Sequence, residues 1–165
     1  MNRRSFLLGS AAIAVFGGFV ISRRLTIAGP ALAESFEITR TEAEWRTVLS
    51  DAQFAVLRQE DTERPWTSPL LQEHRKGVFH CAGCDLGAYA SETKYDSGTG
   101  WPSFWEALPN AVGTKVDSAL LMTRTEVHCR RCGGHFGHIF DDGPPPTGKR
   151  HCINGLALSF RPATA

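Results

Sequence analysis

Five cysteines are the residues best suited to chemistry in this sequence of 165 residues, and their spacing divides them into two groups. Cys81 and Cys84 form one C-x-x-C pair, and Cys129 and Cys132 form a second. A turn can present two sulfurs at this spacing to a single tetrahedral metal ion. Cys152 belongs to neither pair. The pattern therefore predicts a four-cysteine metal site and one further thiol that is free to react.

The ion expected between the two pairs is one structural zinc. Gly83 and Gly133 favour tight turns in which backbone amides point toward the sulfurs. Because 44 residues separate Cys84 from Cys129, the ion would join two hairpins that are distant in the sequence. Closing so long a loop would stabilise the whole domain. Four sulfurs complete the tetrahedron, so we expect no catalytic role for the metal.

Two other uses of the paired cysteines remain open. Each pair could form a redox-active disulfide, above all outside the cytosol. Neither pair, however, is set between a strand and a helix as a thioredoxin-like motif is. Iron accepts the same four thiolates, and the spacing does not distinguish it from zinc.

The unpaired thiol, Cys152, directly follows Lys149, Arg150 and His151. Positive charge close to a thiol lowers its pKa and raises the fraction of reactive thiolate. A single cysteine on a strand is more often a small buried apolar residue. Its assignment as a nucleophile therefore depends on further groups.

Those groups lie in two segments upstream of Cys152. His135 and His138 are three positions apart and could move protons near neutral pH. They could instead support the metal site or a turn, because the second cysteine pair ends three residues before His135. The glycine-rich segment 97–105 contains Trp101, whose indole could form the apolar wall of a pocket. Packing in the core is the commoner role of a tryptophan.

The elements that must position these groups are two short helices followed by strands. Capping boxes at Thr41 and Ser50 predict helices near residues 42–49 and 51–59, and Arg64-Pro65 is expected to end the second. Further along, short runs of β-branched and aromatic residues alternate with glycine, aspartate and proline, as in strands and turns. The expected fold class is mainly β, a small antiparallel domain with helices at its N-terminal side. The predicted strands are Val78–His80, Leu86–Ala90, Ala119–Thr123, Thr125–Cys129 and Cys152–Phe160.

The N-terminal segment has the features of an export signal. Arg3 and Arg4 precede the apolar run 6–21, and small residues at 31–33 offer a cleavage site, as in a twin-arginine signal. The run is shorter than the roughly 20 apolar residues of a membrane span. An uncleaved membrane anchor remains the alternative, because a second pair of arginines follows the run. We predict a signal peptide at residues 1–33, one domain at residues 34–165 and a periplasmic location.

The net charge of the domain and its expected compartment restrict the partners that it can bind. The chain has 18 basic and 17 acidic residues, and four of the arginines precede residue 34, so the domain has a net charge of −3. Such a domain is not expected to bind nucleic acid or an anionic membrane. All of its cysteines would enter an oxidising compartment, where an unpaired thiol is a liability unless it has a chemical use.

Taken together, these motifs resemble the B-type methionine sulfoxide reductases, which reduce methionine-R-sulfoxide. The resemblance is carried by both C-x-x-C pairs and by the segments Gly98–Phe104, Gly137–Pro144 and Arg150–Asn154, and it covers nearly all of Thr41–Phe160. It implies two antiparallel sheets with short helices, and oxidised proteins or peptides as substrates, with free methionine sulfoxide as a further one. We expect a monomer. The implied zinc ligands are Cys81, Cys84, Cys129 and Cys132.

The resemblance also implies a role for each remaining residue. Cys152 would attack the sulfoxide sulfur and become a sulfenic acid. His135 and His138 would position and protonate the sulfoxide oxygen. The substrate-binding residues would be Trp101, which receives the methyl group, and Arg150 and Asn154, which hold the polar network.

One position departs from the family pattern. Many relatives have a second, resolving cysteine where this chain has Thr99, and once the metal ligands are assigned no thiol remains to pair with Cys152. We therefore expect an external thiol or a thioredoxin-like partner to reduce the sulfenic acid directly. His151 also replaces an aromatic residue that often precedes the nucleophile, which can alter the pKa of Cys152.

Two other classes of function fit part of the pattern. A zinc-stapled binding module could keep the fold without catalysis, but it would not need a free thiol beside two histidines. A cysteine hydrolase would use Cys152 for acyl transfer with His138 as its base. The sequence has no evident oxyanion-hole motif or third orienting residue for that reaction.

Overall fold

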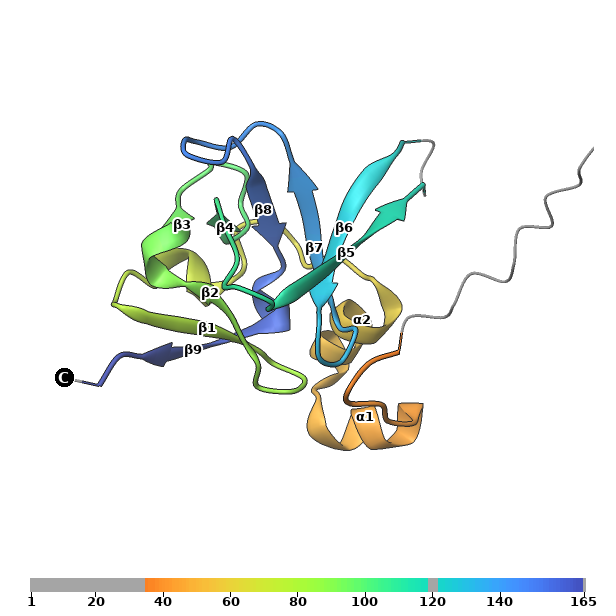
Figure 1. Ribbon diagram of the computed structural model, residues 1–165. Helices are drawn as coiled ribbons and strands as arrows, with labels where there is room; N and C mark the ends of the chain where they lie inside the picture. The colour runs from red at the N-terminus through yellow and green to blue at the C-terminus, as the bar shows by residue number, and fades with distance from the viewer. Residues whose placement is uncertain (1–34, 119–121, 165) are drawn as a thin grey trace, which may run out of the picture. The chain divides into compact units, whose positions relative to one another are not determined.

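The computed structural model describes residues 35–118 and 122–164, and Figure 1 shows how their helices and strands are arranged. The α-helices are α1 (Glu42–Val48) and α2 (Asp51–Gln59), and the 3-10 helices are η1 (Pro69–Gln72), η2 (Ser91–Thr93) and η4 (Gly155–Ala157). The strands are β1 (Gly77–Cys81), β2 (Gly87–Ala90), β3 (Lys94–Tyr95), β4 (Ser103–Phe104), β5 (Val112–Asp117), β6 (Arg124–Cys129), β7 (His135–Phe140), β8 (Arg150–Ile153) and β9 (Leu158–Pro162).

The strands form two sheets in the described part of the chain, and every pairing is antiparallel. One sheet has three strands in the order β2-β1-β9, and the other has six in the order β3-β4-β8-β7-β6-β5. The expected fold class, mainly β with two antiparallel sheets and N-terminal helices, is confirmed. Figure 1 shows the chain leaving β8 through η4 and joining the smaller sheet as β9, beside β1.

The two helices begin where the capping boxes predict. Thr41 and Ser50 each accept a hydrogen bond from the backbone three residues on, and the side chains of Glu44 and Gln53 return the bond. The predicted bounds of α2, residues 51–59, are confirmed, but the residue expected to end the helix was wrong. Glu60 caps α2 with a left-handed backbone, φ 59°, four residues before the expected stop at Arg64. A residue in this conformation ends a helix without proline.

Three of the predicted strands are confirmed, with small changes at their ends, as β1, β2 and β6. The predicted strand Ala119–Thr123 lies partly outside the described residues. The single strand expected over Cys152–Phe160 is instead β8, η4 and β9, and the two strands belong to different sheets. The change of direction occurs at Gly155, where an added Cβ would lie 1.9 Å from Ser68 Oγ. Only glycine fits so close an approach.

A core of aromatic side chains lies between the two sheets. Tyr89 of the smaller sheet stacks on Phe104 of the larger one at 4.4 Å between ring centroids. Phe79 meets the same ring edge-on at 5.1 Å. Within residues 35–118 and 122–164, no helix is long and apolar enough to cross a membrane. The predicted signal and its cleavage site lie outside the described residues.

Candidate active site and metal centre

A row of polar side chains crosses the larger sheet. Cys152 on β8 pairs with Ser103 on β4 on one side and with His138 on β7 on the other. His138 pairs in turn with Glu126 on β6, which pairs with Lys115 on β5. Directly opposed residues project from the same face of an antiparallel sheet. The register therefore brings five side chains that are distant in sequence onto one surface.

Alternation along β8 separates this surface from the core. His151 and Ile153 are buried on the core side, where His151 Nδ1 lies 3.2 Å from the hydroxyl of Tyr89. Burial lowers the pKa of His151 to about 4. His151 is therefore neutral near pH 7 and adds no positive charge beside Cys152, which faces the other way and is half-buried.

Cys152 opens into a pocket of about 150 Å³. Four of the six residues expected to be catalytic or substrate-binding line it, namely Trp101, His138, Cys152 and Asn154. The same wall includes Thr62, Arg124, Gly137 and Phe140. The remaining two, His135 and Arg150, are only 3% and 8% exposed. Neither is among the residues that line this pocket.

The expected low pKa of Cys152 was wrong. Burial raises the pKa of the thiol above its ordinary value, and this outweighs the opposing contributions of Thr99 and Arg150. Thr99 Oγ1 lies 3.9 Å from the sulfur. The ammonium group of the nearby Lys149 forms an ion pair with Asp141, with 2.5 Å between Nζ and Oδ1. Of the cationic neighbours expected from the sequence, Arg150 is thus the one that favours the thiolate.

Arg150→Met should therefore raise the pKa of Cys152 further. The thiolate fraction at any given pH would fall, so the pH profile of Cys152 alkylation by iodoacetamide should move to higher pH than in the wild type. Lys149→Met is the matched control, because Lys149 pairs away from the thiol. An unchanged or lower midpoint in Arg150→Met would contradict this electrostatic assignment.

Trp101 and Asn154 are held in place by the same residue, Glu63. The indole Nε1 of Trp101 donates to the carbonyl oxygen of Glu63 at 3.0 Å, and the backbone N–H of Glu63 donates to Asn154 Oδ1 at 3.0 Å. The Glu63 carboxylate accepts from the N–H groups of Gly155 and Leu156 at 2.5 and 3.0 Å. No role was predicted for Glu63 from the sequence. A buried acid in a polar loop has no local signature, because its partners are 38 positions away for Trp101 and 91 to 93 positions away for the others.

The four paired cysteines come together as expected. Cys81 and Cys84 flank the β1–β2 turn, Cys129 and Cys132 flank the β6–β7 turn, and all four sulfurs lie within 4.8 Å of one another. Cross-pair Sγ–Sγ distances are 3.7 Å for Cys81–Cys132 and 3.4 Å for Cys84–Cys129. A tetrahedral ion with Zn–S bonds of about 2.3 Å requires sulfurs about 3.8 Å apart.

These residues therefore fit zinc, and the ion would join the smaller sheet to the larger one. None of the cysteines is in a disulfide. The backbone N–H of Gly133 donates to the carbonyl oxygen of Cys129 at 2.8 Å, and that of Asp85 donates to Cys81 at 2.8 Å. These bonds form the tight turns that the glycine positions led us to expect.

Comparison with known proteins identifies the family. The SelR domain model matches residues 49–162. A peptide methionine sulfoxide reductase MsrB of Leifsonia xyli is 50% identical over 129 residues, covering 77% of this chain and 93% of that protein. The MsrB of Agrobacterium fabrum is 47% identical, covering 76% and 94%, and that of Methanosarcina barkeri is 48% identical, covering 75% and 88%. The chain belongs to the MsrB family of peptide methionine sulfoxide reductases.

In this MsrB-family enzyme, each histidine of the site has its own carboxylate. His138 Nε2 lies 2.8 Å from Asp117 Oδ2, and Asp117 is also bonded to Arg124 at 2.5 Å. His135 Nδ1 lies 3.0 Å from Glu126 Oε1. The two imidazoles meet edge-on at 5.5 Å between centroids. The hydrogen bond to Asp117 orients the ring of His138, and each imidazole lies beside a carboxylate, on β5 for His138 and on β6 for His135.

The buried arginine of the MsrB-family site is likewise fixed by a carboxylate. Arg150 donates through Nε and Nη2 to the two oxygens of Asp142, at 2.9 and 2.8 Å, and its guanidinium lies 4.4 Å from the ring centroid of Phe140. This pairing lowers the pKa of Asp142. Asp142 lies within the segment Gly137–Pro144 that carries the family resemblance, but no role was predicted for it. The spacing between Asp142 and Arg150 in the sequence does not predict that one guanidinium group would bind both carboxylate oxygens.

Proposed function

We propose that this chain reduces the R epimer of methionine sulfoxide in oxidised proteins and peptides, with Cys152 as the nucleophile. The observation that supports this most strongly is the convergence of a thiol, an imidazole and an indole in one open pocket, formed by Cys152, His138 and Trp101. The indole offers an apolar surface to the S-methyl group, and its Nε1 is already engaged by Glu63.

The proposed reaction transfers oxygen from one sulfur to another. The Cys152 thiolate attacks the sulfoxide sulfur and forms a sulfur–sulfur bond, while the sulfoxide oxygen takes up two protons, the first from His138, and leaves as water. A water molecule then attacks the Cys152 sulfur, which breaks the sulfur–sulfur bond, releases methionine and one proton, and leaves a net transfer of one oxygen to Cys152. The substrate sulfur gains two electrons and becomes methionine. Cys152 loses two electrons and becomes a sulfenic acid. Protonation is required because an unprotonated oxide is a poor leaving group. His135 and Arg150 act as positioning residues from behind the pocket.

Asp117→Asn should shift the pH dependence of turnover. Burial lowers the pKa of His138, and the contact with Asp117 opposes this by raising it. If protonated His138 supplies the proton, turnover falls as pH rises through its pKa. Removing the Asp117 charge lowers that pKa, so the fall should occur at lower pH. Glu106→Gln, a change on the exposed surface, should leave the profile in place, and an unmoved profile in Asp117→Asn would contradict the role of Asp117.

Recycling is proposed to use an external reductant. Two equivalents of a thiol would return the sulfenic acid to Cys152 with release of water and formation of the reductant's disulfide. With four cysteines gathered at the metal centre, Thr99 is the residue beside the nucleophile at 3.9 Å. We also propose that the protein is exported by the twin-arginine route, with zinc bound before the thiols meet an oxidant.

No intramolecular disulfide should therefore form after one turnover. Intact-protein and peptide mass spectrometry of substrate-oxidised wild type should find every cysteine unbridged, with Cys152 as the oxidised residue. Thr99→Cys is the positive control, because it places a second sulfur close to Cys152 and should yield a bond between positions 99 and 152. A wild-type disulfide involving Cys152 would contradict direct recycling.

The test of the proposed activity is an assay that separates the sulfoxide epimers. Zinc-loaded enzyme should be incubated with dithiothreitol and with N-acetyl-methionine-R-sulfoxide or N-acetyl-methionine-S-sulfoxide. Reduction of the R epimer alone is the expected result. Activity on the S epimer, or on neither, would refute the proposal.

A further inference from the structure

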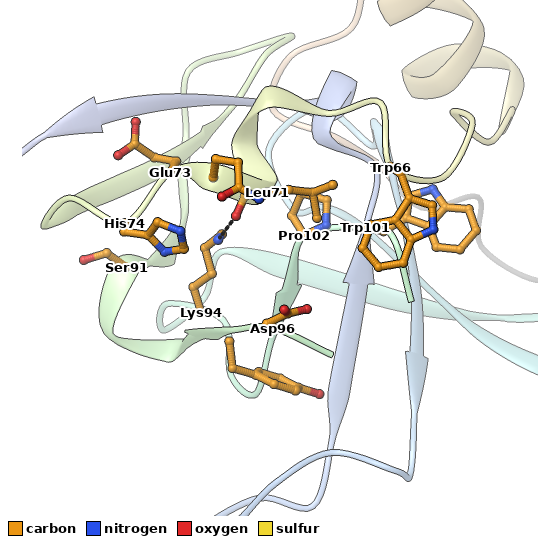
Figure 2. A pocket seen from close by; sticks show the side chains of 11 residues that line it. Trp66, Leu71, Glu73, His74, Ser91, Lys94, Asp96, Trp101 and Pro102 are labelled. Carbon is orange, nitrogen blue, oxygen red and sulfur yellow. Dashed lines mark hydrogen bonds between the residues drawn. The ribbon is translucent and has the colours of Figure 1, made fainter. Parts of the chain in front are cut away.

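A second and larger pocket of about 320 Å³ lies next to the catalytic one, and Trp101 lines both. Figure 2 shows Trp66 beside Trp101 at one end of this second pocket, with Leu71 and Pro102 next to them and Glu73 and His74 toward the other end. The apolar end of the second pocket is therefore the end that adjoins the site of Cys152. Its volume lies in the range of about 300–1,000 Å³ that is typical of ligand sites.

The two pockets are held together as one surface. The segment 62–66 contributes Thr62 to the catalytic pocket and Trp66 to the second pocket. It is tied to the loop of Trp101 twice, by the bond from Trp101 Nε1 to the Glu63 carbonyl and by a 2.8 Å bond from the Trp66 N–H to the Gly100 carbonyl. A polypeptide with one residue at Cys152 would thus meet Trp66 with a neighbouring residue.

Trp66 has properties that packing alone does not explain. Its side chain is 63% exposed, although tryptophan is usually well buried. Its backbone is left-handed, with φ 66°. For a bulky residue this conformation is a strained outlier. Strain that presents a large ring to solvent at the rim of a pocket points to a binding role.

Three charged side chains of the second pocket, those of Glu73, Lys94 and Asp96, have partners within the chain. Glu73 binds the guanidinium of Arg75 at 2.6 Å, and Lys94 Nζ donates to the Leu71 carbonyl at 3.0 Å. Asp96 Oδ1 accepts from the N–H of Gly98 at 2.9 Å. Their pairing leaves the ring of Trp66 and the neighbouring aliphatic surface to meet an occupant. Contacts of this kind favour an apolar side chain over a charged one.

The geometry points to a subsite in this second pocket for an aromatic or large apolar side chain next to the methionine sulfoxide of a polypeptide substrate, with Trp66 as the residue that selects it. The inference rests on the proposed function and specifies its substrate class. Binding energy at this subsite would improve the capture of peptides and would not be available to a single amino acid. The enzyme would therefore favour methionine sulfoxide in apolar sequence contexts, such as segments exposed by unfolding.

The experiment compares kcat/KM for the R epimer in acetylated peptide amides with the sequences Phe-MetO-Gly, Gly-MetO-Phe and Gly-MetO-Gly, and in N-acetyl-methionine-R-sulfoxide. In wild type, at least one phenylalanine peptide should exceed the glycine peptide by about three- to tenfold, as expected for one aromatic contact. Trp66→Ala should remove this preference through KM and leave N-acetyl-methionine-R-sulfoxide unaffected. Trp66→Phe should retain the preference.

Leu71→Ser is the second variant, because Trp66→Ala could disturb the loop of Trp101. It alters a different residue at the apolar end of the same pocket and should also weaken the preference. The inference is overturned if wild type shows no preference, or if the preference survives both Trp66→Ala and Leu71→Ser. Peptides with glutamate or lysine in place of phenylalanine should gain nothing; an equal gain would also overturn it. Failure of wild type to reduce N-acetyl-methionine-R-sulfoxide would instead refute the proposed function.

Discussion

Replacement of Cys152 by serine is expected to abolish methionine sulfoxide reduction and to leave the fold intact. A hydroxyl at this position cannot supply the thiolate that attacks the sulfoxide sulfur, and Cys152 alone combines a thiol with an opening into the catalytic pocket. Turnover in the dithiothreitol assay should fall by at least about 10³-fold, to the background rate. Zinc content and the thermal unfolding midpoint should match those of the wild type.

This result would also separate the enzyme from the two alternative classes. A binding module that had kept the fold would retain its ligand affinity in Cys152→Ser and show no turnover in the wild type. A cysteine hydrolase would lose ester or amide cleavage and never produce methionine from the sulfoxide. Residual sulfoxide reduction above about one-tenth of the wild-type rate would place the reacting sulfur elsewhere.

Removal of the metal is expected to have the largest effect on stability. The four sulfurs lie on two hairpins from different sheets, so the ion would close a long loop and fasten the sheets together. Structural zinc in small domains contributes about 10–16 kcal/mol at pH 7, whereas a typical domain is stable by only about 5–15 kcal/mol. Cys81→Ser should therefore lose the ion and the cooperative unfolding transition, or unfold at least about 15 °C lower.

The measurement pairs metal analysis with calorimetry on purified protein. Wild type and Cys152→Ser should each contain one zinc per chain, and Cys81→Ser should contain none. The two cysteine variants thus have opposite profiles: one loses activity and keeps zinc, and the other loses zinc and, with it, the fold. An apo-protein that melts at the wild-type temperature would contradict a structural role for the ion.

The groups that carry chemistry were predictable because their signals are local. A C-x-x-C pair needs one turn, and each turn forms within a few residues of its cysteines. The capping boxes at Thr41 and Ser50 are equally local, and both helices begin where these boxes place them. The end of α2 at residue 59 was also predicted, but its cause was not, because the left-handed backbone of Glu60 ends the helix and the side chain does not indicate that conformation.

The charges around the site were not predictable, because they depend on strand register. Asp117 and Glu126 reach the two histidines across β5 and β6, and a shift of one residue would turn both away. β7 itself was missed. Its histidines and glycine obscure the alternation of polar and apolar residues that would indicate a strand. Gly137 is needed because a Cβ added there would lie 2.0 Å from the carbonyl oxygen of Cys152. The raised pKa of Cys152 likewise follows from burial, which neighbouring residues in the sequence do not report.

The most direct test of the account is a single turnover of reduced, zinc-loaded enzyme with one equivalent of methionine-R-sulfoxide in the presence of dimedone, which traps sulfenic acids. Peptide mass spectrometry should find dimedone on Cys152, in an amount equal to the methionine formed, with the four metal-site cysteines unmodified. Methionine formation without an adduct at Cys152, or with Cys152 disulfide-bonded to one of the metal-site cysteines, would contradict the account.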